Sequence, residues 1–317
     1  ASIAWIDPAF TVGDFGTIWR NVPSNTKVEL FLRFLLEAKS FNYQNCPVDF
    51  DINRAEQTAT CRLHLMSEAL QWVTVQLMCQ VVAIQDTAKN LSLQNRVWKI
   101  GFSHDEIFAR HVILAIGAEP KNMAFTGPGV ISLHNAIDSE AIKNYLHGDD
   151  TIAVFGSSHS AILVIRNLVE ANVRRIINFY RSPLLYALYL ENWILFDDTG
   201  LKGPTAQWAH ENIDGTLPEN LERVYSSNEN INHYLPQCNK VIYAVGFEKR
   251  NLPIIENMSS VNYIEQCGII APGLFGLGIA FPEAAENAVG LVEYRVGLWK
   301  FMDYLNRVLP IWLSYSA

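Results

Sequence analysis

The chain of 317 residues has few basic residues, no long apolar run and no closely spaced cysteines. Lys and Arg number 24 against 32 Asp and Glu, a net charge of −8. A nucleic-acid-binding protein needs a basic face to displace counterions from phosphates. No apolar run approaches the ~20 residues of a membrane-spanning helix. We therefore expect a cytoplasmic protein with a small-molecule substrate, no nucleic-acid partner and no integral membrane segment.

The cysteines exclude two kinds of site. They are scattered along the chain and include no C-x-x-C pair, so neither a metal site nor a local redox disulfide is predicted. The favoured interpretation is that they are small buried hydrophobic residues in a reducing compartment. The five cysteines are Cys46, Cys61, Cys79, Cys238 and Cys267.

The chain is rich in residues that can form a hydrophobic core: 50% are hydrophobic and 11% are aromatic. This composition excludes a disordered chain. The length predicts two domains. Strand and helix patterns alternate through two similar halves, which indicates an α/β fold with parallel sheets. The spacing predicts helices over residues 28–38, 63–82, 136–147, 161–171 and 283–305, with Pro310 ending the helical region.

The clearest local motif is a glycine turn between a buried strand and a helix. A strand over 151–155 leads into Gly156, Ser157 and Ser158, and the helix begins near Ala161. Such a turn presents backbone N–H groups and a helix dipole to a diphosphate. Gly156, Ser158 and Ala161 occupy the three fingerprint positions, with Ser replacing the second glycine. A turn of this kind that binds no dinucleotide remains the alternative.

The end of the next strand, over 173–180, bears on the choice of cofactor. An acid there would hold a ribose 2′-OH, whereas an Arg would meet a 2′-phosphate. The chain has Tyr180, Arg181 and Ser182 at this point, with Arg174 and Arg175 nearby and no acid. NADPH is therefore favoured over NADH, with Arg181 as its contact. The alternative makes Arg181 an ordinary solvated charge.

Two apolar strands, over 112–116 and 241–245, each stop at a glycine, Gly117 and Gly246. They bracket the nucleotide turn. In this order the chain resembles the flavoproteins with two dinucleotide-binding domains, the superfamily of the disulfide reductases and flavin-containing monooxygenases. The resemblance implies two Rossmann-like, three-layer domains, with an NAD(P)H-binding domain over 149–267 inserted into an FAD-binding domain over 1–148 and 268–317. It also implies cofactor contacts at Ala115, Gly117, Gly246 and Gly278.

Two segments near the beginning of the chain resemble the monooxygenase branch, whereas the paired redox cysteine of the disulfide reductases is absent. Residues 16–20 look like the segment that wraps the flavin, and residues 24–26 read Ser-Asn-Thr. The resemblance implies that the Asn25 amide is catalytic and lies beside the reactive flavin edge. A helix N-cap is the alternative role for residues 24–26, and plain packing for Trp19. The implied cofactor contacts here are Gly16, Thr17, Trp19, Ser24 and Thr26.

Two FAD anchors of the family depart from its pattern. Asp7 fits the acid that holds the adenosine ribose, but no strand and glycine turn precede it, and Gly278 is followed by Ile279 instead of Asp. We expect an N-terminally incomplete chain whose FAD domain is split into two half-sheets, because the missing strand would be central. A stop codon directly upstream of Ala1 would contradict this.

The favoured function is an FAD- and NADPH-dependent oxidoreductase of monooxygenase type, acting on a nucleophilic N or S. One alternative is an NAD(P)H:acceptor flavoreductase that stabilises no peroxide, and another is a degenerate flavoprotein fold used as a binding module. The amphipathic segment 289–313 is expected to dock on its own domain. A membrane surface or a homodimer interface stays open for it. His134 and His159 receive no proton-transfer role.

Overall fold

The computed structural model describes residues 2–258 and 260–315. Two compact units are present: a flanking unit, Ala1–Ala118 with Lys249–Ala317, and an inserted unit, Glu119–Glu248. The predicted domain boundaries were 148/149 and 267/268. The inserted unit begins earlier because Gly129–Val130 joins its sheet. Which cofactor each unit binds stays a prediction.

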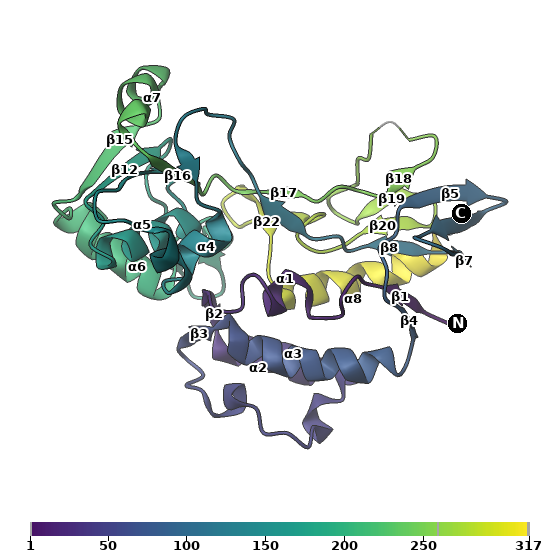
Figure 1. Cartoon of the computed structure of the whole chain (residues 1–317). Coiled ribbons are helices and arrows are strands. Elements are labelled where there is room, and N and C mark those ends of the chain that lie inside the picture. Colours follow the sequence, from purple (N-terminus) through teal and green to yellow (C-terminus); the bar gives the residue numbers. More distant parts are fainter. Residues whose placement is uncertain (1, 259, 316–317) are drawn as a thin grey trace. The chain divides into compact units, whose positions relative to one another are not determined.

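The inserted unit is built on a five-stranded parallel sheet with the order β10-β16-β11-β12-β15. Figure 1 labels β12, β15 and β16 of this sheet. Its central strands are apolar and buried on both faces, as expected for a parallel sheet covered by helices. The predicted strand–turn–helix–strand order is therefore confirmed. The strands are β10 (Gly129–Val130), β11 (Thr151–Phe155), β12 (Arg175–Tyr180), β15 (Leu221–Tyr225) and β16 (Lys240–Tyr243).

Helices and an aromatic cluster cover the two faces of this sheet. On one face α5 packs against β11, β12, α4 and α6. The aromatic cluster contains Phe155, Phe179 and Tyr243, with Phe155 and Phe179 stacked at 4.5 Å. The helices are α4 (Leu133–Ile137), α5 (His159–Glu170), α6 (Gly203–Ala209), the π-helix η5 (His210–Gly215), α7 (Asn228–Tyr234) and the 3-10 helix η6 (Leu235–Gln237).

The helix predicted over 136–147 is wrong, because two side chains end it early. The Asn167 amide donates to the Ala136 and Ile137 carbonyls at 3.1 and 3.0 Å, which ends α4. The Asp138 carboxylate then accepts the N–H groups of Glu140 and Ala141. A separate 3-10 helix, η4, follows over Ala141–Tyr145.

The flanking unit contains two short half-sheets. β1 (Ala4–Ile6) pairs only with β4 (Val82–Ile84), and β8 (Val112–Leu114) pairs with β20 (Leu274–Gly276), which pairs with β19 (Ile269–Ala271). Within residues 2–258 and 260–315 no strand joins them, in agreement with the predicted split. Besides these half-sheets, the unit contains a four-stranded sheet with the order β18-β5-β6-β7. Its strands are β5 (Asn90–Gln94), β6 (Val97–Gly101), β7 (Glu106–Ala109) and β18 (Ile254–Ile255).

The helices predicted over 28–38 and 63–82 are confirmed as α2 (Val28–Glu37) and α3 (Leu63–Met78). They bury one apolar cluster that includes Leu35 and Met66, both 0% exposed. The smaller elements of this region are α1 (Gly13–Gly16), β2 (Pro23–Lys27), β3 (Thr60–Arg62), η1 (Lys39–Phe41), η2 (Tyr43–Asn45) and η3 (Asp51–Arg54).

The helix predicted over 283–305 is wrong in its first half. Residues 283–295 form a hairpin, β21 (Glu283–Glu286) with β22 (Val292–Arg295), and only then does α8 (Leu298–Ser314) begin. The Asn287 Oδ1 accepts the N–H groups of Val289 and Leu291 and makes the turn. Two arginines bind the buried Glu283 carboxylate: Arg295 from β22 and Arg307 from α8.

Helix α8 continues through Pro310, which was expected to end it. Tyr304, Val308 and Trp312 are buried, and the Trp312 ring stacks on Phe275 at 4.8 Å. The helix therefore docks on its own unit, as expected. None of the helices in the described ranges has the length and apolar character needed to cross a bilayer. The remaining strands are β9 (Ala118–Pro120), β13 (Leu188–Tyr189), β14 (Ile194–Leu195) and β17 (Phe247–Lys249).

A buried ion pair ties the beginnings of β11 and β16 together. The Asp150 carboxylate, 1% exposed, accepts from the Lys240 ammonium, the Asn239 amide and the His147 N–H, each at 2.7 Å. Burial raises the pKa of Asp150, but these three donors outweigh it and hold that pKa below its ordinary value. The carboxylate therefore stabilises the fold while it is ionised.

Asp150→Ala should lower the free energy of unfolding by about 3 kcal/mol, because it leaves the Lys240 ammonium without its buried partner. Asp149→Ala removes an exposed acid beside it and should change stability by less than about 0.5 kcal/mol. Urea unfolding followed by circular dichroism measures both. Because the folded pKa of Asp150 is depressed, its stabilisation is present above the unfolded pKa of about 3.9 and is lost as the pH falls through the folded pKa. Equal stability of the two variants would contradict the assignment.

Candidate cofactor-binding sites

The turn between β11 and α5 requires glycine. Gly156 has φ +126°, and a Cβ placed there would lie 2.2 Å from the Ala244 carbonyl oxygen. It would also lie 3.2 Å from the Cβ of Ala161, which is fully buried at the strand–helix contact. The small residues at fingerprint positions one and three therefore let the strand, the turn and the helix approach closely.

Helix α5 presents free backbone donors beside this turn. Ser158 is its N-cap residue, and the first helical hydrogen bond is donated by the Ile162 N–H to the Ser158 carbonyl. In the described part of the chain, the N–H groups of residues 159–161 have no recorded backbone acceptor. Three such donors at the positive end of a helix dipole form an arrangement that binds phosphate groups. Ser157 and Ser158 lie on the turn itself.

A buried asparagine, which the sequence interpretation missed, holds the turn from β12. Asn178 is 0% exposed, and its amide donates to the Gly156 carbonyl at 2.8 Å and the Val154 carbonyl at 3.0 Å. Its Oδ1 accepts from the Arg223 Nε at 2.9 Å. All three polar positions of one carboxamide are thus used. The signal available in the sequence was one polar residue inside an otherwise apolar buried strand.

The arginines around β12 lie at its two ends. Arg181 is exposed and directly follows the strand, on the side of the glycine turn. Arg175 begins the strand at the opposite end, where it pairs with Glu222 at 2.7 Å. Arg174 precedes it there. Arg174 and Arg175, although near Arg181 in the sequence, therefore lie at the other end of β12 from the glycine turn.

His159 begins α5 as a neutral side chain. Burial, with a smaller contribution from Lys202, lowers the pKa of His159 to about 4. Its Nε2 lies 3.5 Å from the Thr205 hydroxyl, and its buried Nδ1 has no hydrogen-bond partner among the described residues. Gly246, the second strand stop, has φ +98° and accepts the Lys121 N–H at its carbonyl.

In the flanking unit, residues 24–26 do not cap a helix, so the N-cap alternative is wrong. Helix α2 begins at Val28, and its Val28 and Glu29 N–H groups bind the carbonyls of residues 59 and 57. The Ser24 hydroxyl instead accepts the Thr26 N–H at 2.8 Å. Asn25 is exposed, and its Oδ1 lies 3.5 Å from the Thr26 hydroxyl. Its amide N–H groups have no partner in the described ranges.

One arginine joins α1, which ends at the predicted contact Gly16, to another predicted contact, Gly117. Arg250 binds the Asp14 carboxylate of α1 at 2.5 Å, and its N–H donates to the Gly117 carbonyl at 3.2 Å. Gly117 has φ +75° and lies shortly after the end of β8. Ala115, between the strand and this glycine, is exposed. Gly16 ends α1, and the N–H groups of Thr17 and Trp19 donate to the Asp14 carbonyl. The sequence interpretation missed Asp14 and Arg250.

Asp7 and Gly278 lie in turns of the same unit. The Asp7 Oδ1 accepts the N–H groups of Ala9 and Phe10 at 2.9 and 2.6 Å, so one carboxylate oxygen is already used within the chain. Gly278 has φ +83°, and its carbonyl accepts the Phe281 N–H. The adjacent Ile279 is 37% exposed, so this turn presents an apolar side chain where the family has a carboxylate.

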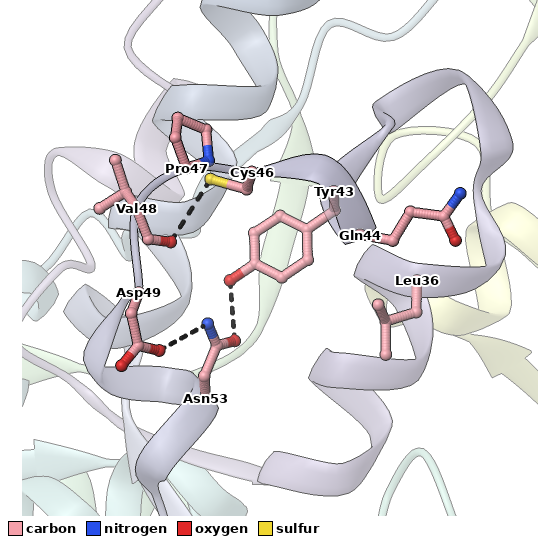
Figure 2. A pocket seen from close by; sticks show the side chains of 8 residues that line it. All are labelled: Leu36, Tyr43, Gln44, Cys46, Pro47, Val48, Asp49 and Asn53. Carbon is pink, nitrogen blue, oxygen red and sulfur yellow. Dashed lines mark hydrogen bonds between the residues drawn. The ribbon is translucent and has the colours of Figure 1, made fainter.

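Apart from these residues, the flanking unit has a cavity of about 330 Å³ between the end of α2 and η3. Figure 2 shows the Tyr43 ring pointing into it, with its hydroxyl directed at Asn53. That hydroxyl donates to the Asn53 Oδ1 at 2.9 Å, and the Asn53 amide donates to Asp49 at 3.2 Å. These groups satisfy one another, and none of the predicted site residues lines the cavity.

Comparisons with known proteins agree with this architecture. The chain is 33% identical to monooxygenase AgnR1 of Paecilomyces divaricatus over 360 aligned residues, which cover 99% of the chain and 92% of that protein. No family model matches the chain.

Among solved structures, the ornithine N-hydroxylase of Kutzneria sp. 744 aligns with a TM-score of 0.61, at 10% identity over 99% of this chain and 91% of that one. A flavin-containing monooxygenase from Stenotrophomonas maltophilia aligns with a TM-score of 0.59, at 12% identity over 99% and 98%. At these identities, the structural likenesses show the fold alone.

Asn178→Ala should lower the free energy of unfolding by about 2 kcal/mol, because it removes the two hydrogen bonds that the buried carboxamide donates to the Gly156 and Val154 carbonyls. Asn228→Ala, at an exposed position of α7, is the matched control and should change stability by less than about 0.5 kcal/mol. Urea denaturation midpoints of the two purified variants provide the comparison. An Asn178→Ala protein as stable as the control would show that the carboxamide does not hold the turn.

Proposed function

Because this chain belongs to the family of monooxygenase AgnR1, among the flavoprotein oxidoreductases with two dinucleotide-binding domains, we propose that it is an FAD- and NADPH-dependent monooxygenase. NADPH supplies two electrons, one oxygen atom of O₂ goes to a nucleophilic nitrogen or sulfur, and the other leaves as water. The Kutzneria ornithine N-hydroxylase, which shares the fold, was solved with reduced FAD, NADP⁺ and L-ornithine. The observation that carries the proposal is the glycine turn with its free α5 amides, in a chain of this family.

The inserted unit binds NADPH in this proposal. The Gly156 turn leaves no room for a Cβ, and the free N–H groups of residues 159–161 suit a diphosphate. The neutral His159 adds no charge at this point. Arg181 meets the 2′-phosphate from the end of β12. The residues assigned to this cofactor are Gly156, Ser157, Ser158, Ala161, Arg181 and Gly246.

The flanking unit binds FAD, which when bound accepts hydride from NADPH and reacts with O₂. Asn25 is the proposed catalytic residue, because its exposed amide has free N–H groups that can donate to the reacting oxygen. The positive φ of Gly117 suits a backbone that passes close to the flavin, and the Arg250–Asp14 pair lies beside this glycine. Ile279 does not supply the carboxylate that the family has at this position. The residues assigned to FAD are Asp7, Gly16, Thr17, Trp19, Ser24, Thr26, Ala115, Gly117 and Gly278.

The proposal predicts that the full-length protein purifies with a flavin visible spectrum that NADPH bleaches in the absence of air. With O₂ and a panel of amines and thioethers, one oxygen atom from isotopically labelled O₂ should enter at least one product, detected by mass spectrometry. A colourless protein that takes up no FAD would contradict the proposal. Complete release of the reducing equivalents as hydrogen peroxide with every substrate would instead identify a flavoreductase.

Asn25→Ala tests the catalytic assignment within the same experiment. It should lower oxygen transfer roughly 100-fold while the flavin content stays unchanged, because one preorganised donor is lost. Gln80→Ala removes an exposed carboxamide whose one recorded hydrogen bond is to the Gln76 carbonyl of its own helical region. That control should keep the activity of the unaltered protein. Equal activity of the two variants would remove Asn25 from the mechanism.

A further inference from the structure

The inserted unit contains a second arginine beside the glycine turn, held in one orientation. Arg223 lies in β15, opposite Asn178 of β12 in the strand register. Its Nε donates to the Asn178 Oδ1 at 2.9 Å, and its guanidinium carbon lies 4.7 Å from the centre of the Tyr180 ring. A hydrogen bond and a cation–π contact therefore fix the plane of the guanidinium.

Among the residues that the structure describes, this half-buried cation has no carboxylate partner. Burial lowers the pKa of Arg223, and the nearby Tyr180, Asp214 and Tyr186 act in the opposite direction. The Asp214 carboxylate is already bound by the Tyr186 hydroxyl at 2.5 Å and lies 3.3 Å from the His210 Nδ1. In residues 2–258 and 260–315 no ion pair to Arg223 is recorded. A partly desolvated guanidinium with two free terminal nitrogens is a binding group for an anion.

Asn178 connects this cation to the nucleotide turn. Its amide holds the Gly156 carbonyl at 2.8 Å, and its Oδ1 holds Arg223. The guanidinium and the turn are therefore attached to opposite sides of one carboxamide. A dinucleotide whose diphosphate lies on the turn places its adenosine ribose over the end of the next strand, here β12 at Tyr180. Tyr180, at that end of β12, is the residue whose ring the Arg223 guanidinium contacts.

We propose that Arg223 recognises the 2′-phosphate of NADPH and sets the preference for NADPH over NADH. The inference rests on the proposed function. The two free terminal nitrogens of Arg223 can bind two phosphate oxygens, in an orientation that Asn178 and Tyr180 fix before the cofactor arrives. Arg181 is exposed and has no contact that fixes it in the described chain. Arg181 therefore adds positive charge near the phosphate but no fixed orientation, and it contributes less than Arg223 to the discrimination between NADPH and NADH.

The test measures the dissociation constants of NADPH and NADH with the full-length, flavin-loaded protein. Arg223→Gln should weaken NADPH roughly 10- to 100-fold, because charged hydrogen bonds are lost, and change NADH less than about twofold. Arg223→Lys keeps the charge without the planar fork and should give an intermediate loss. Arg181→Gln alters the other arginine assigned to the 2′-phosphate and should weaken NADPH less than Arg223→Gln does. Unchanged NADH binding shows that each variant is folded.

Two results would overturn the assignment. One is a loss of the NADPH preference in Arg181→Gln but not in either Arg223 variant. The other is an equal weakening of NADPH and NADH in Arg223→Gln and Arg223→Lys, which would show a purely structural role. An unaltered protein that holds flavin but binds neither nicotinamide cofactor would instead refute the NADPH part of the proposed function, and this inference with it.

Discussion

The inserted unit depends on one buried carboxamide. Asn178 makes three hydrogen bonds from a fully buried position, to Val154, Gly156 and Arg223. A buried polar group of this kind is costly unless it is fully satisfied, so its partners are held in one arrangement. The Gly156 carbonyl is bound by Asn178. The N–H groups at the beginning of α5 are not used by the described part of the chain in this way and can donate to a ligand. Strand, turn and guanidinium are thereby fixed before any cofactor binds.

Much of this arrangement could be predicted from the sequence, because it is local. The β11–turn–α5–β12 order follows from apolar runs separated by Gly156, and the contact of Ala161 follows from its fingerprint position. Arg223 could not be found in this way. The pairing of β15 with β12 brings Arg223 next to Asn178, which is 45 residues away in the sequence. No local sequence pattern encodes such a pairing.

The errors in secondary structure have the same origin. Residues 283–286 read Glu-Ala-Ala-Glu and favour a helix, but Glu283 is buried between two arginines from β22 and α8. These tertiary ion pairs and the Asn287 turn outweigh helix propensity. The predicted helix over 136–147 failed because Asn167, from a different helix, binds the last carbonyls of α4. Pro310 was expected to end α8, which instead continues to Ser314, with Trp312 stacked on Phe275 beyond the proline.

In the described part of the flanking unit, no strand joins the two half-sheets. Ile279 stands where the resemblance implies an acid, and one carboxylate oxygen of Asp7 is occupied by its own turn. Arg250 nevertheless links α1, which ends at Gly16, to Gly117, because it contacts both Asp14 and the Gly117 carbonyl. In the proposed division of work, this unit carries the flavin chemistry and the inserted unit supplies the reducing cofactor.

The central claim is that NADPH binds the glycine turn of the inserted unit. Hydrogen–deuterium exchange of the full-length protein, with and without NADPH, tests it most directly. The account predicts slower exchange in peptides that cover the amides of residues 157–161, because those N–H groups gain phosphate acceptors, and in peptides that cover 178–182 and 221–225. Protection confined to other parts of the chain, or no change on saturation with NADPH, would contradict it.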